Sequence, residues 1–128
     1  MTRKSRSPRP SAAAVTFAMV HEAAAGLPGV ELATSYGTPA LKARGRLFAR
    51  LHQTGDALVL RASALDRQIF MQSQPGTFYI TEHYRDHPWV LVRLSAVTRP
   101  ELPALLERAW RMVAPRRLVA QRDARAAR

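Results

Sequence analysis

Two histidines spaced four residues apart are the first residues in this sequence whose types suggest chemistry. The segment TEHYRDHPWVLVRL places His83 and His87 beside two carboxylates, a tyrosine, a tryptophan and two arginines. Histidines at this spacing bind a metal when they share one face of an α-helix. Pro88 disfavours helical backbone at His87, and zinc requires a third and a fourth ligand. We therefore expect no metal site, but a loop anchored by Tyr84 and Trp89 that leads into a strand.

Basic residues interleaved with aromatic rings suggest a second kind of site, a binding surface. Side chains alternate between the two faces of a strand, so RLFARLH places Phe48 with Arg50 on one face and Leu47 with Ala49 on the other. The same reasoning gives the basic candidates for nucleic-acid binding, which are Lys42, Arg44, Arg46, Arg50, Arg61 and Arg93. The aromatic candidates, for a surface or a pocket, are Tyr36, Phe48, Tyr84 and Trp89.

This mixture of side chains has two interpretations. Arginine neutralises phosphate and flat rings stack on unpaired bases, so the composition is typical of a nucleic-acid surface. The hairpin with Lys42, Arg44 and Arg46 around a glycine turn could also enter a groove as a wing. Alternatively, the face is simply solvated, its polar positions are filled by arginine, and Phe48 is covered by a loop. The sequence pattern leaves both interpretations open.

Residue patterns that carry catalysis do not occur in the sequence. Without cysteine there is no thiolate nucleophile and no cysteine-ligated zinc. TSYGTPA offers Ser35 and Tyr36, but it lacks the strand-turn-helix context of a nucleophile elbow. No glycine-rich phosphate loop or GxGxxG motif is present, so a nucleotide cofactor is unsupported. We expect a protein that is not an enzyme and that carries no cofactor.

The length and charge of the chain indicate how many domains it has and where its tails lie. Its 128 residues suffice for one domain with a single core. The net charge of +11 is concentrated at the ends, because residues 1–10 and 115–128 carry +4 each. We predict a disordered basic tail at 1–14, one domain at 15–119 and a basic C-terminal tail at 120–128. The sequence has no apolar run long enough to span a membrane, so we expect no membrane partner and a cytoplasmic protein.

The hydrophobic pattern predicts a helix near each end of the domain. Thr16 is placed to cap the first helix, and Gly26 to end it. Thr98 and Glu101 form a capping box for the last helix. The apolar positions of that helix make one wide stripe, which consists of Leu102, Leu105, Leu106, Ala109, Trp110 and Val113.

Short strands are predicted between these two helices. ALKARGRLFARLH indicates a hairpin about Arg44-Gly45, and ALVLRA, TFYIT and WVLVRL are further strands. A short helix follows ALVLRA, with Leu65, Ile69 and Met71 as the residues expected to face inward. The pattern predicts an α+β two-layer sandwich, with an antiparallel sheet of five or six strands and the N- and C-terminal helices on one face. The other face of the sheet would then be open to water.

Several linked motifs give the chain a family resemblance. GLPGVELATSYGTPALKARGRLFARL, FYITEHYRDHPWVLVRL and AWRMVAPRRL occur in this order, and together they resemble the MmcQ/YjbR family of small bacterial proteins. The resemblance covers roughly Val15 to Val119 and implies a sandwich of the frataxin-like (CyaY-like) fold. Family members are labelled as candidate DNA-binding proteins with paired β-hairpin wings, and they have no agreed catalytic residues. The implied DNA contacts here are Lys42, Arg44, Arg46 and Arg50.

Two functional hypotheses follow from the residues and the resemblance. The leading one is a bacterial DNA-binding protein that contacts the phosphate backbone through its basic hairpin and open sheet face. The alternative is a non-catalytic module that binds a small anionic ligand or a protein partner through the rings and arginines of that face. Neither hypothesis requires a cofactor or a metal.

Overall fold

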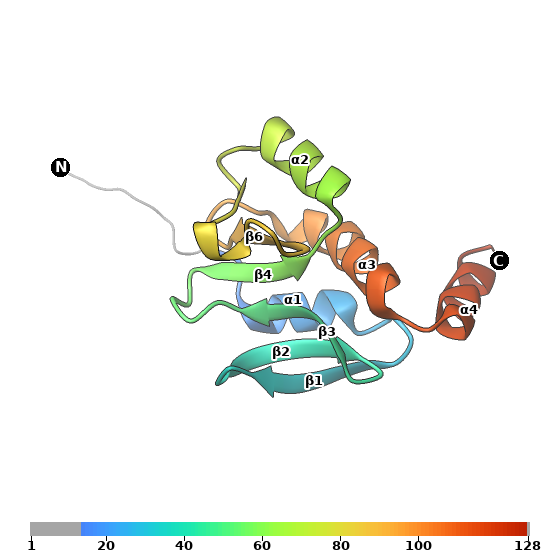
Figure 1. Cartoon of the computed structure of the whole chain (residues 1–128). Helices are drawn as coiled ribbons and strands as arrows, with labels where there is room; N and C mark the ends of the chain where they lie inside the picture. Colours follow the sequence, from blue (N-terminus) through green and yellow to red (C-terminus); the bar gives the residue numbers. More distant parts are fainter. Residues whose placement is uncertain (1–13, 128) are drawn as a thin grey trace.

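Six antiparallel strands form one sheet, and two helices pack together against one of its faces (Figure 1). The computed structural model describes residues 14–127. The strands are β1 (Val30–Ser35), β2 (Thr38–Ala43), β3 (Arg46–Leu51), β4 (Ala57–Arg61), β5 (Phe78–Tyr79) and β6 (Trp89–Arg93), in the spatial order β1-β2-β3-β4-β6-β5. The helices are α1 (Phe17–Ala24), α2 (Ala64–Ser73), α3 (Leu102–Val113) and α4 (Arg116–Ala126), with 3-10 turns η1 (Glu82–Tyr84) and η2 (Arg99–Glu101). The predicted α+β fold is confirmed.

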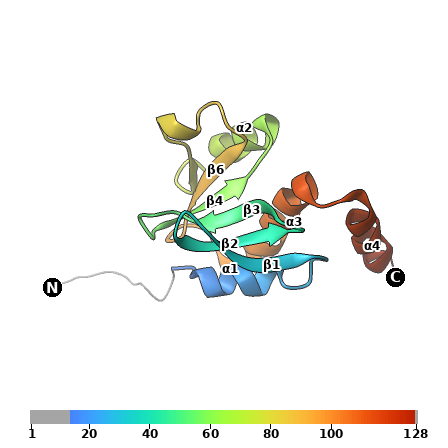
Figure 2. The same ribbon diagram turned by 60° about the horizontal axis from the view of Figure 1, so that its bottom comes forward.

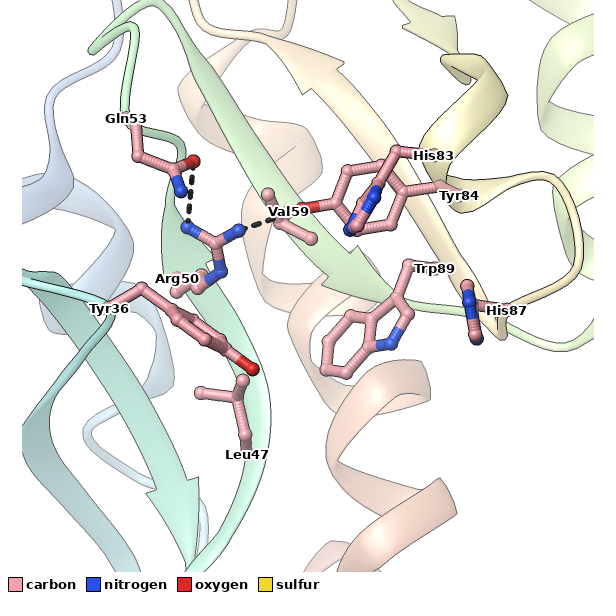
Figure 3. Close-up of a pocket in the computed structure, with 9 residues that line it drawn as sticks. All are labelled: Tyr36, Leu47, Arg50, Gln53, Val59, His83, Tyr84, His87 and Trp89. Atoms are coloured by element: carbon pink, nitrogen blue, oxygen red, sulfur yellow. Dashed lines mark hydrogen bonds between the residues drawn. The ribbon is translucent and has the colours of Figure 1, made fainter.

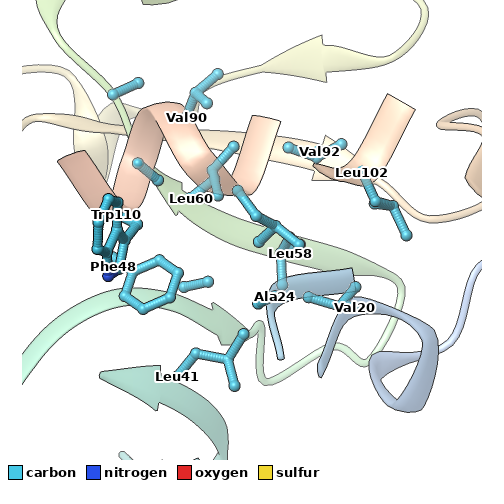
Figure 4. Close-up of a cluster of buried hydrophobic side chains, with 14 of the residues drawn as sticks. Val20, Ala24, Leu41, Phe48, Leu58, Leu60, Val90, Val92, Leu102 and Trp110 are labelled. Atoms are coloured by element: carbon cyan, nitrogen blue, oxygen red, sulfur yellow. The ribbon is translucent and has the colours of Figure 1, made fainter. Parts of the chain in front are cut away.

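The core lies between the sheet and the helices α1 and α3, on the side that we call the closed face. Figure 4 shows this cluster, in which the helices contribute Val20, Ala24, Leu102 and Trp110 and the strands contribute Leu41, Phe48, Leu58, Leu60, Val90 and Val92. Trp110 is completely buried, and its indole Nε1 donates to the carbonyl of Pro28 at 2.9 Å. Both terminal helices of the predicted domain therefore cover the same face of the sheet.

The ends of these helices follow the signals in the sequence. The Thr16 side chain accepts a hydrogen bond from the backbone N–H of Met19, as an N-cap residue does. The Glu101 carboxylate accepts from the backbone N–H of Thr98 at 2.8 Å, which completes the predicted capping box. Hydrogen bonding of this carboxylate by the Thr98 backbone lowers the pKa of Glu101.

Two tight turns join the first three strands. At the predicted Arg44-Gly45 turn both residues have positive φ, of 50° and 83°, as a type I′ hairpin requires. A second turn of the same kind, at Tyr36-Gly37 with φ of 54° and 79°, joins β1 to β2. Tyrosine is an unusual residue at this turn position, which favours asparagine or glycine. β1 is an edge strand of the sheet.

A β-bulge at Phe48 makes one prediction wrong. Lys42 pairs with Leu47 and Leu41 pairs with Ala49, so Phe48 is an extra residue in β3. Phe48 and Ala49 are both completely buried in the core of the closed face. Phe48 is therefore not a surface or pocket residue. Strict alternation failed because the bulge turns two successive side chains toward the same face.

The inward face of α2 is also different from the prediction. Leu65 and Ile69 are 66% and 49% exposed, so they do not face inward. Met71 packs against the core as predicted, and so does Phe70, whose ring stacks on that of Phe78 with the centroids 4.8 Å apart. Phe70 and Met71 therefore connect α2 to the core.

The predicted C-terminal tail contains a helix. α4 runs through Ala126 and lies at one end of the molecule, beyond α3 (Figures 1 and 2). It buries Leu118, packs Val119 against the core, and is also attached by ion pairs. Glu107 of α3 accepts from Arg122 of α4 at 3.0 Å and from Arg111 at 2.8 Å. These bonds, that to Arg122 first, lower the pKa of Glu107.

Of the N-terminal tail predicted at 1–14, residues 1–13 lie outside the described residues. Within residues 14–127, no helix combines the length and apolar character needed to cross a lipid bilayer.

Candidate functional site

The second face of the sheet, which we call the open face, is partly covered by the loop between β5 and β6. Tyr84 in this loop is only 7% exposed, and it packs on Ala57, Val59 and Leu91. Its hydroxyl accepts a hydrogen bond from Arg50 Nη2 at 2.7 Å, across 34 residues of sequence. The predicted role of Tyr84 as the anchor of this loop is confirmed, and the contact with Arg50 ties the loop to β3.

Arg67 of α2 holds the same loop from the other side. Its guanidinium donates to the carbonyls of Tyr84 at 2.9 Å, Arg85 at 2.8 Å, His87 at 2.8 Å and Trp89 at 3.3 Å. Four carbonyls of the loop thus point to the Arg67 guanidinium, whose several N–H groups can donate to more than one acceptor at once. Arg67 fixes the path of the backbone from η1 to β6, which positions His87 and Trp89.

Arg50 is the most buried charged group of the open face, with only 5% of its surface exposed. Besides the Tyr84 hydroxyl, it donates from Nη1 to Gln53 Oε1 at 3.4 Å and to the Leu51 carbonyl at 3.3 Å. Its guanidinium carbon lies 5.1 Å from the centroid of the Tyr36 ring. All these partners are neutral, and within residues 14–127 no carboxylate forms an ion pair with Arg50.

A pocket of about 540 Å³ lies between Arg50 and the loop (Figure 3). It is lined by Tyr36, Leu47, Arg50, Gln53, Val59, His83, Tyr84, His87 and Trp89. Five of these nine side chains carry planar rings, and none is an aspartate or a glutamate among the residues the structure describes. The volume is in the range that small-molecule sites occupy. The pocket thus combines flat apolar walls with one buried positive charge.

His83 and His87 both line this pocket, but they do not share a helix. The 3-10 turn η1 ends at Tyr84, before His87. The two imidazole centroids are 6.3 Å apart. No group of three or more histidine, cysteine, aspartate or glutamate side chains is arranged for a metal within the described part of the chain. The imidazoles are available as hydrogen-bonding groups of the pocket wall.

Two further predicted arginines stack on aromatic rings of the open face. The guanidinium of Arg61 lies 5.2 Å from the Trp89 centroid, and its Nε is buried without a hydrogen-bond partner within residues 14–127. Arg93 is exposed at the other end of β6, 4.1 Å from the centroid of the Tyr79 ring. Arg61 is therefore next to a pocket wall, whereas Arg93 is not.

The remaining predicted cations belong to the β2–β3 hairpin. Lys42 pairs with Leu47, whose side chain lines the pocket, so alternation places Lys42 on the open face. Arg46 pairs with buried Ala43 and so points to the closed-face side, where it is exposed at the end of the sheet. Arg44 occupies the turn. The six predicted basic residues therefore do not form one surface.

Gly29 brings this hairpin tip next to α4. It has a φ of 74°, and a Cβ placed on it would lie 2.7 Å from Leu118 Cδ1 and 3.6 Å from Arg44 Cγ. Only glycine fits such a close approach without movement of a neighbour. The first two residues of α4, Arg116 and Arg117, are exposed and directly precede Leu118. The side chain of Arg44 and the start of α4 are therefore neighbours at this end of the molecule.

The fold and the order of the motifs agree with one protein family. The family model described as YjbR matches residues 25–112, which is more than half of the chain. The chain belongs to the YjbR family. The resemblance to the MmcQ/YjbR proteins in the sequence is thus confirmed.

Relatives of this YjbR protein are similar to it over different lengths. The uncharacterized proteins Rv2570 of Mycobacterium tuberculosis and Mb2600 of Mycobacterium bovis are 41% identical to it over 46 residues. That match spans 36% of this chain and 36% of each relative's length. The crystal structure of Deinococcus radiodurans protein DR2400, a DUF419 domain, is similar with a TM-score of 0.64 at 20% identity, covering 77% of this chain and 78% of that one. This likeness concerns the fold.

The YjbR match contains the whole pocket and ends before α4. All nine lining residues lie between positions 36 and 89, inside the matched range of 25–112. The sequence pattern indicated Tyr36, Arg50, Tyr84 and Trp89 as candidates, but it gave no signal for Leu47, Gln53, Val59 and the supporting Arg67. Apolar Leu47 and Val59 resemble core residues in sequence, and nothing local indicates that Arg67 meets a loop twenty residues away.

Proposed function

We propose that this YjbR-family protein is a non-catalytic binding protein whose ligand carries an anionic group held by Arg50. The observation that supports this is a guanidinium that is 5% exposed at a pocket and bonded only to neutral oxygens within residues 14–127. Burying a cation without a counter-charge is costly, and the hydrogen bonds to neutral acceptors offset only part of that cost. A bound phosphate or carboxylate would supply the opposite charge through stronger, charge-assisted bonds.

The surroundings of Arg50 favour the same kind of ligand. The pocket-lining residues of the described chain include no carboxylate that would repel an anion, while His83 and His87 can donate hydrogen bonds to one. Arg61 lies against the back of the Trp89 wall and adds a second positive charge close by. A polar ligand group in a mostly apolar, ring-lined pocket is the common arrangement of small-molecule sites. A cytoplasmic location stays a prediction.

The competing explanation is that Arg50 only fastens the loop to β3. Nuclear magnetic resonance of the full chain separates the two, with inorganic phosphate, acetate and a panel of small organic phosphates as probes. Saturable shifts of the Arg50 side-chain signal and of pocket amides are expected. Arg50→Gln should abolish them, whereas Arg93→Gln should not, because Arg93 is an open-face arginine stacked on a tyrosine outside the pocket.

A second candidate is DNA binding at the end of the molecule where the hairpin meets α4. Its specific support is the proximity of Arg44, at the hairpin tip, to Leu118 of α4. Arg44, Arg46, Arg116 and Arg117 have no carboxylate within ion-pair distance in residues 14–127. Unpaired cations gathered on one surface suit phosphate contacts. This surface replaces the single open-face surface that the sequence suggested.

Duplex binding by the full chain across a salt series tests this second candidate. The logarithm of the affinity should fall linearly with that of the salt concentration, and Arg44→Glu with Arg46→Glu should remove most of the affinity. The matched control is Arg85→Glu with Arg99→Glu, which changes the net charge equally at two arginines that are already paired with Glu82 and Glu22. Equal losses in both variants would mean that only the net charge attracts DNA.

A further inference from the structure

The side chains that form the pocket walls indicate which chemical group the ligand carries in addition to an anionic group. Tyr36 from the β1–β2 turn and Trp89 from the start of β6 lie on opposite sides of the pocket, with Arg50 next to the Tyr36 ring (Figure 3). The Tyr36 side chain is exposed at this position, and Trp89 is half-buried. Two rings facing one space form a slot for a third flat group, because aromatic faces stack on one another.

The backbone at Tyr36 indicates that its ring has a purpose other than folding. A φ of 54° is a costly conformation for a large side chain, and asparagine or glycine would adopt it more easily. The ring is 78% exposed, so its burial does not compensate for that strain. Its close contact is with the guanidinium of Arg50. Strain of this kind is concentrated at binding and active sites.

We propose that the pocket binds a planar aromatic or heteroaromatic ring that carries a phosphate or carboxylate. This rests on the proposed function, because it uses Arg50 as the anion contact. The ring enters between Tyr36 and Trp89, its edge meets the apolar side chains of Leu47 and Val59, and its anionic group reaches Arg50. A volume of about 540 Å³ accepts a molecule of the size of a mononucleotide. Tyr36 is then a ligand-binding residue at the rim of the pocket.

Two probes of equal charge and similar size test this inference, phenyl phosphate and cyclohexyl phosphate. Only the first has a planar ring. Titration calorimetry of the full chain, with quenching of tryptophan fluorescence as a second readout, should give an affinity about tenfold higher for phenyl phosphate, which one stacking contact readily provides. Benzoate and cyclohexanecarboxylate form a second pair that replaces phosphate by carboxylate.

Substitution of Tyr36 gives a result that a purely structural role would not give. Tyr36→Asn removes the ring and suits the turn better, so the urea midpoint should stay unchanged or rise. Phenyl phosphate affinity should nevertheless fall about tenfold, to the level of the cyclohexyl probe. Tyr36→Phe keeps the ring and should keep the affinity. A Tyr36→Asn variant that still prefers phenyl phosphate would overturn the inference.

The outcomes separate this inference from the proposed function. Equal, Arg50-dependent binding of the planar and the non-planar probe would overturn the ring requirement while the anion site stands. Absence of binding by all four probes, in wild-type protein and at millimolar concentration, would overturn both. Preference for the planar members of both pairs, lost in Tyr36→Asn and in Arg50→Gln, supports both.

Discussion

Trp110 and Trp89 lie on opposite faces of one sheet, and they are held in different ways. On the closed face Trp110 is completely buried among apolar side chains, and the only polar atom of its side chain donates to the Pro28 carbonyl. On the open face Trp89 is half-buried, borders the pocket and contacts the guanidinium of Arg61. The closed face is stabilised by removing apolar surface from water, whereas the open face depends on arginine contacts and leaves its rings accessible to a ligand.

The largest expected effect tests the closed face. Trp110→Ala should lower the free energy of unfolding by about 4 kcal/mol, because it opens a large cavity in the core. Trp110→Phe is the control, since it keeps a ring in the core while it leaves the Pro28 carbonyl without a donor. It should cost about 2 kcal/mol. Urea denaturation of both variants measures these changes. A cost for Trp110→Ala no greater than that for Trp89→Ala would contradict the difference between the faces.

The second-largest loss of stability is expected at Arg67, which supports the loop on the open face. Arg67→Met removes the donor that four loop carbonyls share, and it should cost about 2 kcal/mol. Hydrogen exchange should accelerate most at the amides of Tyr84, His87 and Trp89, while the amides of α3 stay protected. Arg85→Met, which removes an exposed arginine of the same loop, is the matched control and should change little. Uniform acceleration across the molecule would show that Arg67 is not a local support.

Much of the closed face could be predicted from the sequence, whereas the pocket could not. Local patterns determine the caps at Thr16 and Thr98 and the Arg44-Gly45 turn, and these were predicted correctly. The extra residue at Phe48 breaks the alternation from which the open face was inferred, and no local pattern marks it. The contact of Arg50 with Tyr84 joins residues 34 positions apart, so it exists only once the sheet is assembled.

Contacts between residues far apart in the sequence also explain why α4 was not predicted. We predict from the sequence a domain that ends at residue 119 and a basic tail that follows it, although Pro115 is well suited to the start of a helix. The arginine-rich composition after it indicates a solvated tail, and the stabilising contacts come from Glu107 on a different helix. Long-range pairing between charged residues has no periodicity that a single sequence would display.

A smaller loss of stability is expected when Trp89 on the open face is replaced. Trp89→Ala should cost about 1 kcal/mol, because the indole is half-buried and its stacking with Arg61 is partly solvated. Binding should change more than stability, with a loss of affinity for phenyl phosphate. Trp89→Phe keeps a ring in the wall and should retain most of that affinity. If Trp89→Ala unfolded the protein, the open-face ring would be a core residue and the contrast with Trp110 would be lost.

The smallest effect concerns α4, which is attached to closed-face helix α3 by charge as well as by Leu118. Hydrogen bonds from Arg122 and Arg111 lower the pKa of Glu107 below its ordinary 4.5. Glu107 therefore stabilises the folded state fully above the unfolded pKa, and this contribution is lost as the pH falls through the folded pKa. Because the group is partly exposed, we expect only about 0.5 kcal/mol, seen as faster hydrogen exchange in α4 below pH 4.

Glu107→Gln should abolish this pH dependence and give α4 at neutral pH the exchange rates that it otherwise has in acid. Glu31→Gln is the matched control, because Glu31 forms no ion pair within residues 14–127. If α4 kept its pH dependence in Glu107→Gln, another carboxylate would hold it, and Asp123, whose pKa is lowered mainly by Arg111, is the next to replace. Because α4 adjoins the hairpin tip rather than the pocket, its loosening should leave phenyl phosphate binding unchanged.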